Sequence, residues 1–298
     1  MTKPSLLILA AGLGSRYGGF KQIDPIGPNG EVIIDYSIFD ACRAGFGKIV
    51  IITQPKLEAP LREHFTKTLG ESAEIVYTFQ NIDDLPSGFS IPDGRQKPWG
   101  TAHAIWAARV ELHEPFGVIN ADDFYGPQSF RVLHDFLVTQ PPDEYALVGF
   151  QLVKTLSQHG TVSRGICRAD AGGYLVDVTE HTKIEPDGAG AARSLEAGCA
   201  LAGDAVASMN MFGFDPSLFA HLDAQFRDFL KTQIENPKSE FFIPTVVDTL
   251  IKSGRARCKI LKTPEQWFGV TYQEDRAQAA STLQQFIARG IYPASLKS

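Results

Sequence analysis

The stretch "LILAAGLGSRYGGFKQ", Leu7 to Gln22, begins as a buried strand and then loses almost every residue that could continue one. Two alanines and four glycines follow the apolar start, and Arg16 and Lys21 are its only charged residues. A glycine-rich turn after a short apolar run exposes backbone N–H groups, and such groups hold an anion, most often a phosphate. The stretch therefore predicts a first strand that ends in a phosphate-binding turn.

Composition indicates a globular chain without a membrane segment. Of the 298 residues, 44% are hydrophobic and 21% are charged, and no apolar stretch approaches the roughly 20 residues that cross a bilayer. The four cysteines lie far apart without a CxxC pair, which argues against a disulfide framework or a structural zinc site. The net charge of −6 argues against nucleic-acid binding. We expect a cytoplasmic protein with neither a membrane nor a nucleic acid as partner.

The first half of the chain alternates β-branched runs with amphipathic segments, which is typical of a parallel sheet covered by helices. The runs LLILA, KIVIIT, EIVYTF, PFGVINA and YALVGFQL are expected strands. The expected helices lie near Asp35–Ala44, Glu58–Leu69, Thr101–Val110 and Gln128–Val138. We interpret residues up to about 150 as one wound α/β unit.

The second half changes character after Thr161. SRGICRAD and YLVDVTEH flank an Ala-Gly-Gly turn and predict an antiparallel hairpin, and Glu185–Ala205 is expected to form an exposed excursion. The strands SMNMFGFD and CKILKT follow, with helices near Ser217–Thr232, over FFIPTVVDTLIK and near Asp275–Arg289. Because no Pro- or Ser-rich linker divides the chain, we expect a single domain over residues 1–298.

Two other phosphate-binding turns fit the opening stretch poorly. A dinucleotide fingerprint needs GxGxxG at a helix start, but Gly18 comes one residue late and Pro25 and Pro28 follow. The second strand ends at Thr53–Gln54 without the carboxylate that would bind a ribose. A Walker loop needs GK[ST], which is missing. A purely structural turn leaves Arg16 and Lys21 unexplained.

The turn AAGLGSRYGGFKQ resembles the signature loop of the sugar nucleotidyltransferases, the NDP-sugar pyrophosphorylases, whose pattern is roughly GGxGTRL...PK. Ser15 stands where that family usually has threonine, and Phe20 precedes the lysine. The resemblance implies that the loop wraps a nucleoside triphosphate, that Arg16 assists pyrophosphate departure and that Lys21 neutralises phosphate charge. The implied nucleotide-binding residues in this loop are Ala10, Ala11, Gly12, Gly14 and Ser15.

A second motif, KPWGTAHAIWAA, covers Lys97–Ala108. A glycine and a small hydroxyl residue at a helix start let a flat base approach the backbone closely. The segment resembles the family's GTAxA segment, which implies that Gly100 and Thr101 contact the nucleobase; an ordinary helix N-cap fits the residues equally well. Lys97 and Trp99 could instead belong to a loop that closes over the site.

A third motif, GVINADDFYG, ends an apolar strand with two acids at the edge where open α/β sheets bind ligands. It resembles the family's GDxxxG segment, which implies that Asp122 binds Mg²⁺. Magnesium takes hard oxygen ligands and keeps substrate phosphates and waters, so few protein carboxylates suffice. Asp123 is the less certain of the two, since adjacent acids at a strand end also cap a following helix.

Three weaker segments lie in the second half. DVTEHTKI resembles an EKP-like segment, although two residues separate its acid from its lysine, and implies that Glu180 contacts the sugar and Lys183 its phosphate. SMNMFGFD resembles a sugar-binding strand and suggests Asn210. QWFGVTYQEDR lies where many members carry a second metal aspartate, and here Asp275 is the candidate.

Together these segments imply a Rossmann-like three-layer α/β fold of the nucleotide-diphospho-sugar transferase type. Its sheet would be mixed and mostly parallel, with an antiparallel hairpin in the second half. Residues 1–150 would bind the NTP and residues 151–298 the acceptor. The implied reaction is Mg²⁺-dependent transfer from an NTP to a sugar 1-phosphate, giving an NDP-sugar and pyrophosphate. Two alternatives stay open: a cytidylyltransferase acting on phosphocholine or another small phosphate, and a nucleotide-sensing homologue without activity.

Overall fold

The computed structural model describes residues 2–12, 25–71, 73–157, 160–188, 190–269 and 273–297. Strand β1 (Ser5–Leu9) lies at the centre of the first half, hydrogen-bonded in parallel to β2 (Lys48–Thr53) and to β4 (Phe116–Asn120). Strand β3 (Glu74–Phe79) pairs in parallel with β2. Residues of β1 and β2 point alternately into two hydrophobic clusters, one on each face of the sheet. These strands are continuous apolar runs because both of their faces are buried.

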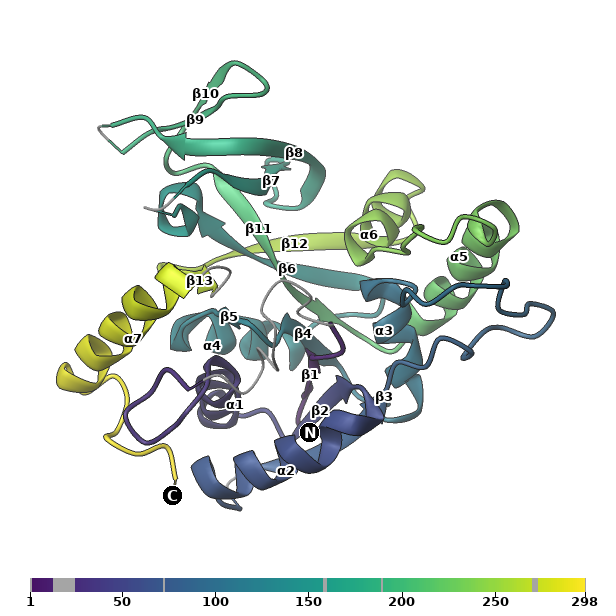
Figure 1. Ribbon diagram of the computed structural model, residues 1–298. Helices are drawn as coiled ribbons and strands as arrows, with labels where there is room; N and C mark the ends of the chain where they lie inside the picture. Colours follow the sequence, from purple (N-terminus) through teal and green to yellow (C-terminus); the bar gives the residue numbers. More distant parts are fainter. Residues whose placement is uncertain are drawn as a thin grey trace.

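Strand β11 (Val206–Phe214) joins the two halves of the chain. It pairs antiparallel with β4, with β6 (Glu144–Gln151) and with β7 (Val162–Ala169). Strand β8 (Leu175–Pro186) completes the predicted hairpin with β7, and β12 (Arg257–Lys262) runs parallel to β6. All of these strands belong to one 11-stranded sheet, in which the strands of both halves lie side by side (Figure 1).

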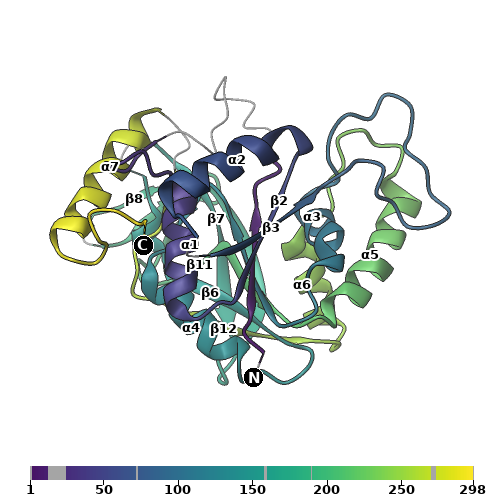
Figure 2. The ribbon, with the colours of Figure 1, turned by 90° about the horizontal axis from the view of Figure 1, so that it is seen from below.

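Helices cover both faces of this sheet, and Figure 2 shows the two layers with the sheet between them. One layer packs on the cluster that contains Leu61 and Phe130, and the other on the cluster that contains Trp106 and Phe226. The first layer contains α1 (Ile33–Ala44), α2 (Pro55–Thr68), α4 (Pro127–Leu137) and α7 (Gln273–Ala288). The second contains α3 (Thr101–Ala107), α5 (Leu218–Gln233) and α6 (Ile243–Lys252). The three-layer α/β fold is thus confirmed. None of the helices in the described ranges is long and apolar enough to span a membrane.

The mixed sheet contains more antiparallel pairs than the sequence predicted. The parallel pairs join β1 to β2 and β4, β2 to β3, and β6 to β12. Although YALVGFQL was expected to continue the wound unit, β6 pairs with β11 and not with β4. The reason is that β11, from far along the sequence, occupies the position next to β4.

The segment 185–205 is not only an exposed excursion. It contains β9 (Ala192–Ser194) and β10 (Cys199–Leu201), a short hairpin that extends the sheet beyond β8. Ala192 and Ser194 are buried, which the Gly- and Ala-rich sequence did not indicate. In Figure 1 this hairpin extends away from the helical layers.

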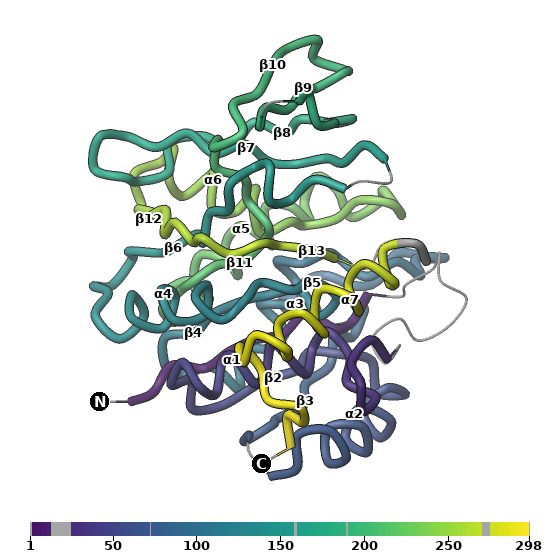
Figure 3. Tube along the Cα trace, turned by 90° about the vertical axis from the view of Figure 1, so that its left-hand side faces the viewer, coloured from purple at the N-terminus to yellow at the C-terminus, as the bar shows by residue number. Residues whose placement is uncertain are grey.

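The C-terminal segment after α7 packs against α1 (Figure 3). The hydroxyl of Tyr292 donates a hydrogen bond of 2.7 Å to Oδ2 of Asp40, and the guanidinium of Arg43 lies 2.7 Å from Oδ1 of the same carboxylate. Asp40 is only 1% exposed. Burial raises the pKa of Asp40 to about 7, although Arg43 and Tyr292 oppose the rise. This carboxyl group is therefore more easily protonated in the folded than in the unfolded chain.

We predict that Asp40 makes the fold more stable toward mildly acidic pH. Because the folded-state pKa of about 7 lies above the ordinary value of 3.8, the folded chain binds the extra proton between these values. The contribution to the free energy of unfolding is therefore largest near pH 4 and is lost as the pH rises through 7. Urea unfolding of the wild type and of Asp40→Asn from pH 5 to pH 8 should show this slope in the wild type and a smaller one in Asp40→Asn. The exposed-site variant Asp228→Asn should keep the wild-type slope, and equal slopes in all three proteins would contradict the assignment.

Candidate active site

The carboxyl ends of β1, β2 and β4 meet at one edge of the sheet, as the parallel register requires. The backbone N–H of Ala121 donates to the carbonyl of Leu9 over 3.2 Å, and that of Ala10 donates to Ile52 over 2.8 Å. The side-chain amide of Gln54 donates to the carbonyl of Ala11 over 2.9 Å. The first residues of the glycine-rich turn are therefore fixed between the ends of β2 and β4, beside Asp122.

The rest of the turn is not described. Gly14, Ser15, Arg16 and Lys21 lie outside the described residues, so their roles stay predictions. The described chain resumes at Pro25, whose carbonyl accepts hydrogen bonds from the guanidinium of Arg276 on α7, the shorter of them 2.7 Å. Two described residues near the segment 13–24 are thus fixed, Ala11 at the strand edge and Pro25 at α7.

Gln80 connects this edge to α3, and the sequence analysis missed it. It directly follows β3, its backbone N–H donates to Thr53, and its side-chain amide donates to the carbonyl of Gly100 over 2.9 Å. The same amide nitrogen lies 3.1 Å from Nδ1 of His103, whose Nε2 lies 2.8 Å from the carbonyl of Asp84. Burial lowers the pKa of His103, so the ring is neutral and can accept at Nδ1 while it donates at Nε2. A polar residue immediately after a parallel strand was the signal that could have revealed Gln80.

Gly100 and Thr101 both hold the start of α6 in place. Gly100 has a φ of +102°, and a Cβ built on it would lie 2.6 Å from the carbonyl oxygen of Phe241. The hydroxyl of Thr101 accepts a hydrogen bond of 3.2 Å from the backbone N–H of Ile243. These contacts give the GTAHA segment a structural role. Contact of Gly100 and Thr101 with a nucleobase stays a prediction.

Trp99 is a core residue and does not form a loop that closes over the site. Its side chain is completely buried, and its indole N–H donates to the carbonyl of Ile82 over 2.9 Å. The guanidinium of Arg95 lies 3.3 Å from the centre of the Trp99 ring. Lys97 forms an ion pair of 2.5 Å with Glu240. The interpretation of Trp99 as part of a closing loop is wrong, because its apolar ring fills the space between α3 and α5.

The two adjacent acids after β4 differ in their surroundings. Asp123 lies in β5 (Asp123–Phe124) and is 8% exposed. Its Oδ2 accepts a hydrogen bond of 2.9 Å from the side-chain amide of Asn120 and lies 3.2 Å from the hydroxyl of Tyr125. Burial and the charge of Asp123 raise the pKa of Tyr125 well above its ordinary value, so this hydroxyl stays protonated. Asp122 is half-buried at the same edge. The geometry therefore assigns Asp123 to the internal hydrogen-bond network and leaves Asp122 as the metal candidate.

The segment around Gly269 reaches this site through β13 (Phe268–Gly269), which pairs antiparallel with β5. Gly269 lies opposite Asp123, and a Cβ on it would lie 2.9 Å from Oδ1 of Asp123. Asp275 lies in the first turn of α7, and residues 270–272, between β13 and α7, are not among the described residues. The parts of the chain that the structure describes contain no group of three His, Cys, Asp or Glu side chains that could hold a metal ion. A half-buried aspartate at a strand end fits an ion that takes most of its ligands from substrate phosphates and water.

The two acceptor candidates on β8 are Glu180 and Lys183. Their side chains share one face because β8 has one more residue than β7 at this point. Val162 pairs with Ile184, and Arg164 pairs with His181. Between these two pairs β8 advances by three residues and β7 by only two, which is a β-bulge in β8. Lys183, within this bulge, has a φ of +50°. Side chains three positions apart point to opposite faces of a regular strand, but one inserted residue restores the same face. The bulge thus accounts for the two residues that separate Glu180 from Lys183.

Asn210 lies at another irregular position. The pairing of β11 with β6 shifts register between Ser208 and Phe212, and Asn210 has a φ of +58°. The carbonyl of the preceding Met209 lies 3.1 Å from the hydroxyl of Tyr125, which also contacts Asp123. This contact brings the Asn210 bulge to the end of β4. Backbone strain of this kind is concentrated at functional sites, but binding of a sugar by Asn210 stays a prediction.

Arg164 is a second residue that the sequence analysis missed. Its guanidinium lies 4.8 Å from the centre of the Trp267 ring and donates to Thr155 and to the carbonyl of Ser163. Burial lowers the pKa of Arg164 to about 10, and the charges of Asp123 and Glu180 oppose that fall. Arg164 therefore keeps its positive charge at neutral pH. Nothing in the local sequence indicates this, because Thr155 and Trp267 come from other elements.

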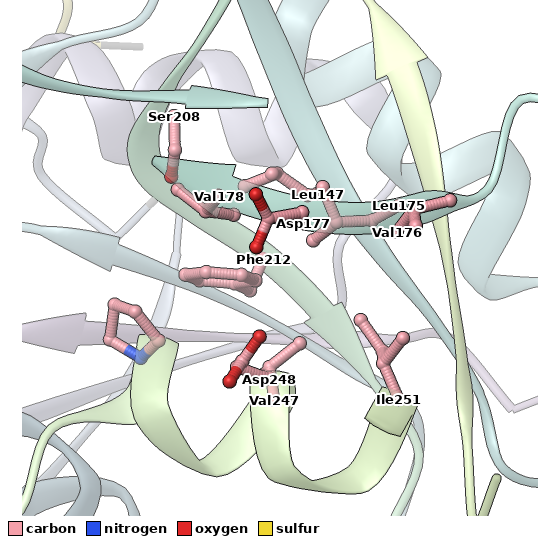
Figure 4. A pocket seen from close by; sticks show the side chains of 11 residues that line it. Leu147, Leu175, Val176, Asp177, Val178, Ser208, Phe212, Val247, Asp248 and Ile251 are labelled. Atoms are coloured by element: carbon pink, nitrogen blue, oxygen red, sulfur yellow. The ribbon is translucent and has the colours of Figure 1, made fainter. Parts of the chain in front are cut away.

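A groove on the opposite face of the sheet is separate from these residues. It lies between β8 and α6 and is lined mainly by apolar side chains, among them Leu175, Phe212 and Val247 (Figure 4). The carboxylates of Asp177 and Asp248 stand at this groove, and the Lys252 ammonium lies 2.7 Å from Asp248. These apolar residues belong to the cluster under α3, α5 and α6, whereas Tyr125 belongs to the cluster on the other face.

Comparison with known proteins identifies the family. Residues 6–270 match the nucleotidyl transferase family, and because this covers most of the chain, the protein belongs to that family. No curated protein matches the sequence.

Solved structures share the fold at low sequence identity. A UDP-glucose pyrophosphorylase complexed with UDP-glucose has a TM-score of 0.62 and 17% identity, and the match covers 95% of this chain and 99% of that one. A putative glucose-1-phosphate thymidylyltransferase from Bacillus anthracis has a TM-score of 0.62 and 14% identity over 94% of this chain and 95% of the other. An inositol-1-phosphate CTP transferase from T. maritima has a TM-score of 0.60 and 12% identity over 96% and 98% of the two chains. The expected fold type is thereby confirmed.

We predict that Gly100→Ala destabilises the protein by about 2 kcal/mol or more, because it combines a left-handed backbone with a clash against Phe241. Gly94→Ala is the matched control, since Gly94 also has a positive φ, +77°, but its Cβ would have no neighbour within 4 Å among the described atoms. The control should lose only about 1 kcal/mol. Urea unfolding measures both values. Equal losses would show that the contact between Gly100 and Phe241 does not limit this position.

Proposed function

We propose that this nucleotidyltransferase transfers a nucleotidyl group from an NTP to a sugar 1-phosphate, releasing pyrophosphate and an NDP-sugar. The observation that carries the proposal is the hydrogen-bonded edge that joins the start of the glycine-rich turn to Gln80 and Gly100 on one side and to Ala121, the neighbour of Asp122, on the other. In a chain of the nucleotidyl transferase family, this edge would bind a nucleotide with its phosphates toward Asp122. The fold shared with sugar-nucleotide pyrophosphorylases supports the same substrate class.

The reaction needs positioning and charge neutralisation more than covalent chemistry. A phosphate oxygen of the acceptor attacks the α-phosphorus in line, the bond to the β-phosphate oxygen breaks, and pyrophosphate leaves with the bonding electrons. The backbone N–H groups of the turn, with Arg16 and Lys21, would oppose the negative charge on the phosphoryl oxygens. On the acceptor side, Lys183 would hold the attacking phosphate, and Glu180 and Asn210 would bind sugar hydroxyls.

Asp122 would hold the magnesium ion together with the phosphates of the substrate. When bound, Mg²⁺ neutralises charge on the phosphoryl oxygens and orients them for attack. Asp275 is the proposed second carboxylate. Asp123 would act indirectly, because its hydrogen bonds to Asn120 and Tyr125 fix the turn that carries Asp122.

A nucleotide-by-acceptor matrix tests the proposed activity. We expect pyrophosphate release from one NTP with a sugar 1-phosphate and little release with phosphocholine. A choline group is held by aromatic faces, whereas the acceptor candidates Glu180, Lys183 and Asn210 are polar side chains. Preference for phosphocholine with CTP would favour the cytidylyltransferase alternative. Nucleotide binding without pyrophosphate release from any pair would favour the nucleotide-sensing alternative.

We predict that Asp122→Asn lowers kcat about a hundredfold or more with little change in the thermal midpoint, because the amide keeps the shape but loses the charge that holds Mg²⁺. Pyrophosphate release at saturating substrates and a Mg²⁺ titration measure the effect. Asp93→Asn, at an exposed position, should leave kcat unchanged. Full turnover of Asp122→Asn at ordinary Mg²⁺ would show that another residue holds the metal.

A further inference from the structure

His103, on α3, is completely buried, and its neighbours fix the ring. Its ring centre lies 5.8 Å from that of Trp106, in a stacked arrangement, and 5.1 Å from that of Phe226. Its Nε2 lies 2.8 Å from the carbonyl oxygen of Asp84, and because a carbonyl oxygen can only accept, Nε2 carries a proton. Burial lowers the pKa of His103, so the ring is neutral and Nδ1 is an acceptor without a proton.

The side-chain amide of Gln80 lies between this ring and the start of α3. Its nitrogen donates to the carbonyl of Gly100 over 2.9 Å and lies 3.1 Å from Nδ1 of His103. An amide nitrogen has two N–H groups and cannot accept, so these two acceptors use both groups and fix the nitrogen toward α3. Gln80 is half-buried at the end of β3, and none of the described residues donates a hydrogen bond to its Oε1. Oε1 is therefore the polar atom of this amide that is left for a ligand.

The partners of the two side chains are themselves fixed by the protein. The carbonyl of Gly100 also accepts a hydrogen bond of 3.1 Å from the backbone N–H of Ala104. The carboxylate of Asp84 lies 3.2 Å from the guanidinium of Arg109, which holds the loop whose carbonyl faces Nε2. The orientation of the amide is thus set before any ligand binds, which is the condition for precise recognition.

We propose that His103 is a positioning residue for the nucleotide: it holds the nitrogen of the Gln80 amide, so that Gln80 presents only an acceptor and selects a base that turns an N–H group toward it. This inference rests on the proposed function and adds a rule for base recognition. A freely turning amide could present its nitrogen as well and would then also bind a base edge with an acceptor at that point. A fixed amide rejects such a base, because two acceptors would face each other without a hydrogen bond.

The main test compares His103→Phe, which keeps an aromatic ring but removes both nitrogens, with Trp106→Phe, which disturbs the packing of the same helix and keeps the His103 nitrogens. We expect His103→Phe to raise the KM for the preferred NTP about fivefold to tenfold, which corresponds to one lost hydrogen bond, with the KM for the sugar phosphate within about twofold of the wild type. His103→Asn should recover part of the loss, because its amide oxygen can accept from Gln80 in place of Nδ1. Trp106→Phe should leave both KM values within about twofold of the wild type.

Base selectivity and a double-mutant cycle distinguish positioning from general destabilisation. In His103→Phe the ratio of kcat/KM for the preferred NTP to that for the next-best NTP should fall, because the amide of Gln80 can then turn. Gln80→Leu alone should raise the same KM, and His103→Phe should add little to it. An unchanged ratio, additive effects, or equal increases in the KM for both substrates would overturn the inference.

A measurement without turnover separates this inference from the proposed function. With ¹⁵N-labelled histidine near neutral pH, the NMR spectrum of the wild type should show His103 with a proton on Nε2 and none on Nδ1, and the loss of these signals in His103→Asn assigns them. A proton on Nδ1 would overturn the inference even if the wild type is active. If His103→Phe does not fold, this spectrum and the KM values of Gln80→Leu give the answer. A wild type that shows the expected tautomer but releases no pyrophosphate from any NTP with a sugar phosphate would overturn the proposed function and leave the fixed amide in place.

Discussion

Strand β4 is hydrogen-bonded to β1 on one side and to β11 on the other, and the candidate site depends on this double pairing. The parallel pairing with β1 places the end of β4 next to the start of the glycine-rich turn, so Asp122 and the turn share one edge. The antiparallel pairing with β11 brings in the second half of the chain, and the Met209 carbonyl contacts the Tyr125 hydroxyl beside Asp123. If β11 paired elsewhere, the nucleotide candidates and the acceptor candidates would lie on separate surfaces.

Two of the acceptor candidates lie at irregular backbone positions. Lys183 and Asn210 both have positive φ, and both lie where a strand gains residues relative to its partner. A regular strand would turn Lys183 away from Glu180, so the inserted residue in β8 is needed for the two side chains to share one face. The nucleotide side is organised differently. There, regular parallel strands end at the same level, and Gln54 and Gln80 fix the neighbouring loops by hydrogen bonds to carbonyl groups.

The two aspartates after β4, Asp122 and Asp123, have different candidate roles because they differ in burial. Asp123 is enclosed by Asn120, Tyr125 and Gly269, so its charge stabilises the turn and balances Arg164. Asp122, one position earlier, stays half-buried at the edge where phosphates are expected. A charge such as that of Arg164 tolerates partial burial because two carboxylates compensate for it and three of its N–H groups are paired. The buried hydrogen bonds of Asp123 therefore support the turn that carries Asp122.

The sequence by itself determined the order of most strands and helices, because apolar periodicity is a local signal. Glycine clusters and acids at strand ends are local signals too, and from them come the predictions of a phosphate-binding turn and of Asp122 as the metal ligand. It also led to the family, which the match over residues 6–270 confirms. Only the tertiary structure decided that β11 and not β6 lies beside β4, that Trp99 fills the core, and that Gly100 and Thr101 support the start of α6. The contacts of Gln80 with Gly100 and of Arg164 with Thr155 are also visible only in the tertiary structure. Each of these depends on contacts between residues far apart in the chain, and such contacts leave no pattern in the neighbouring sequence.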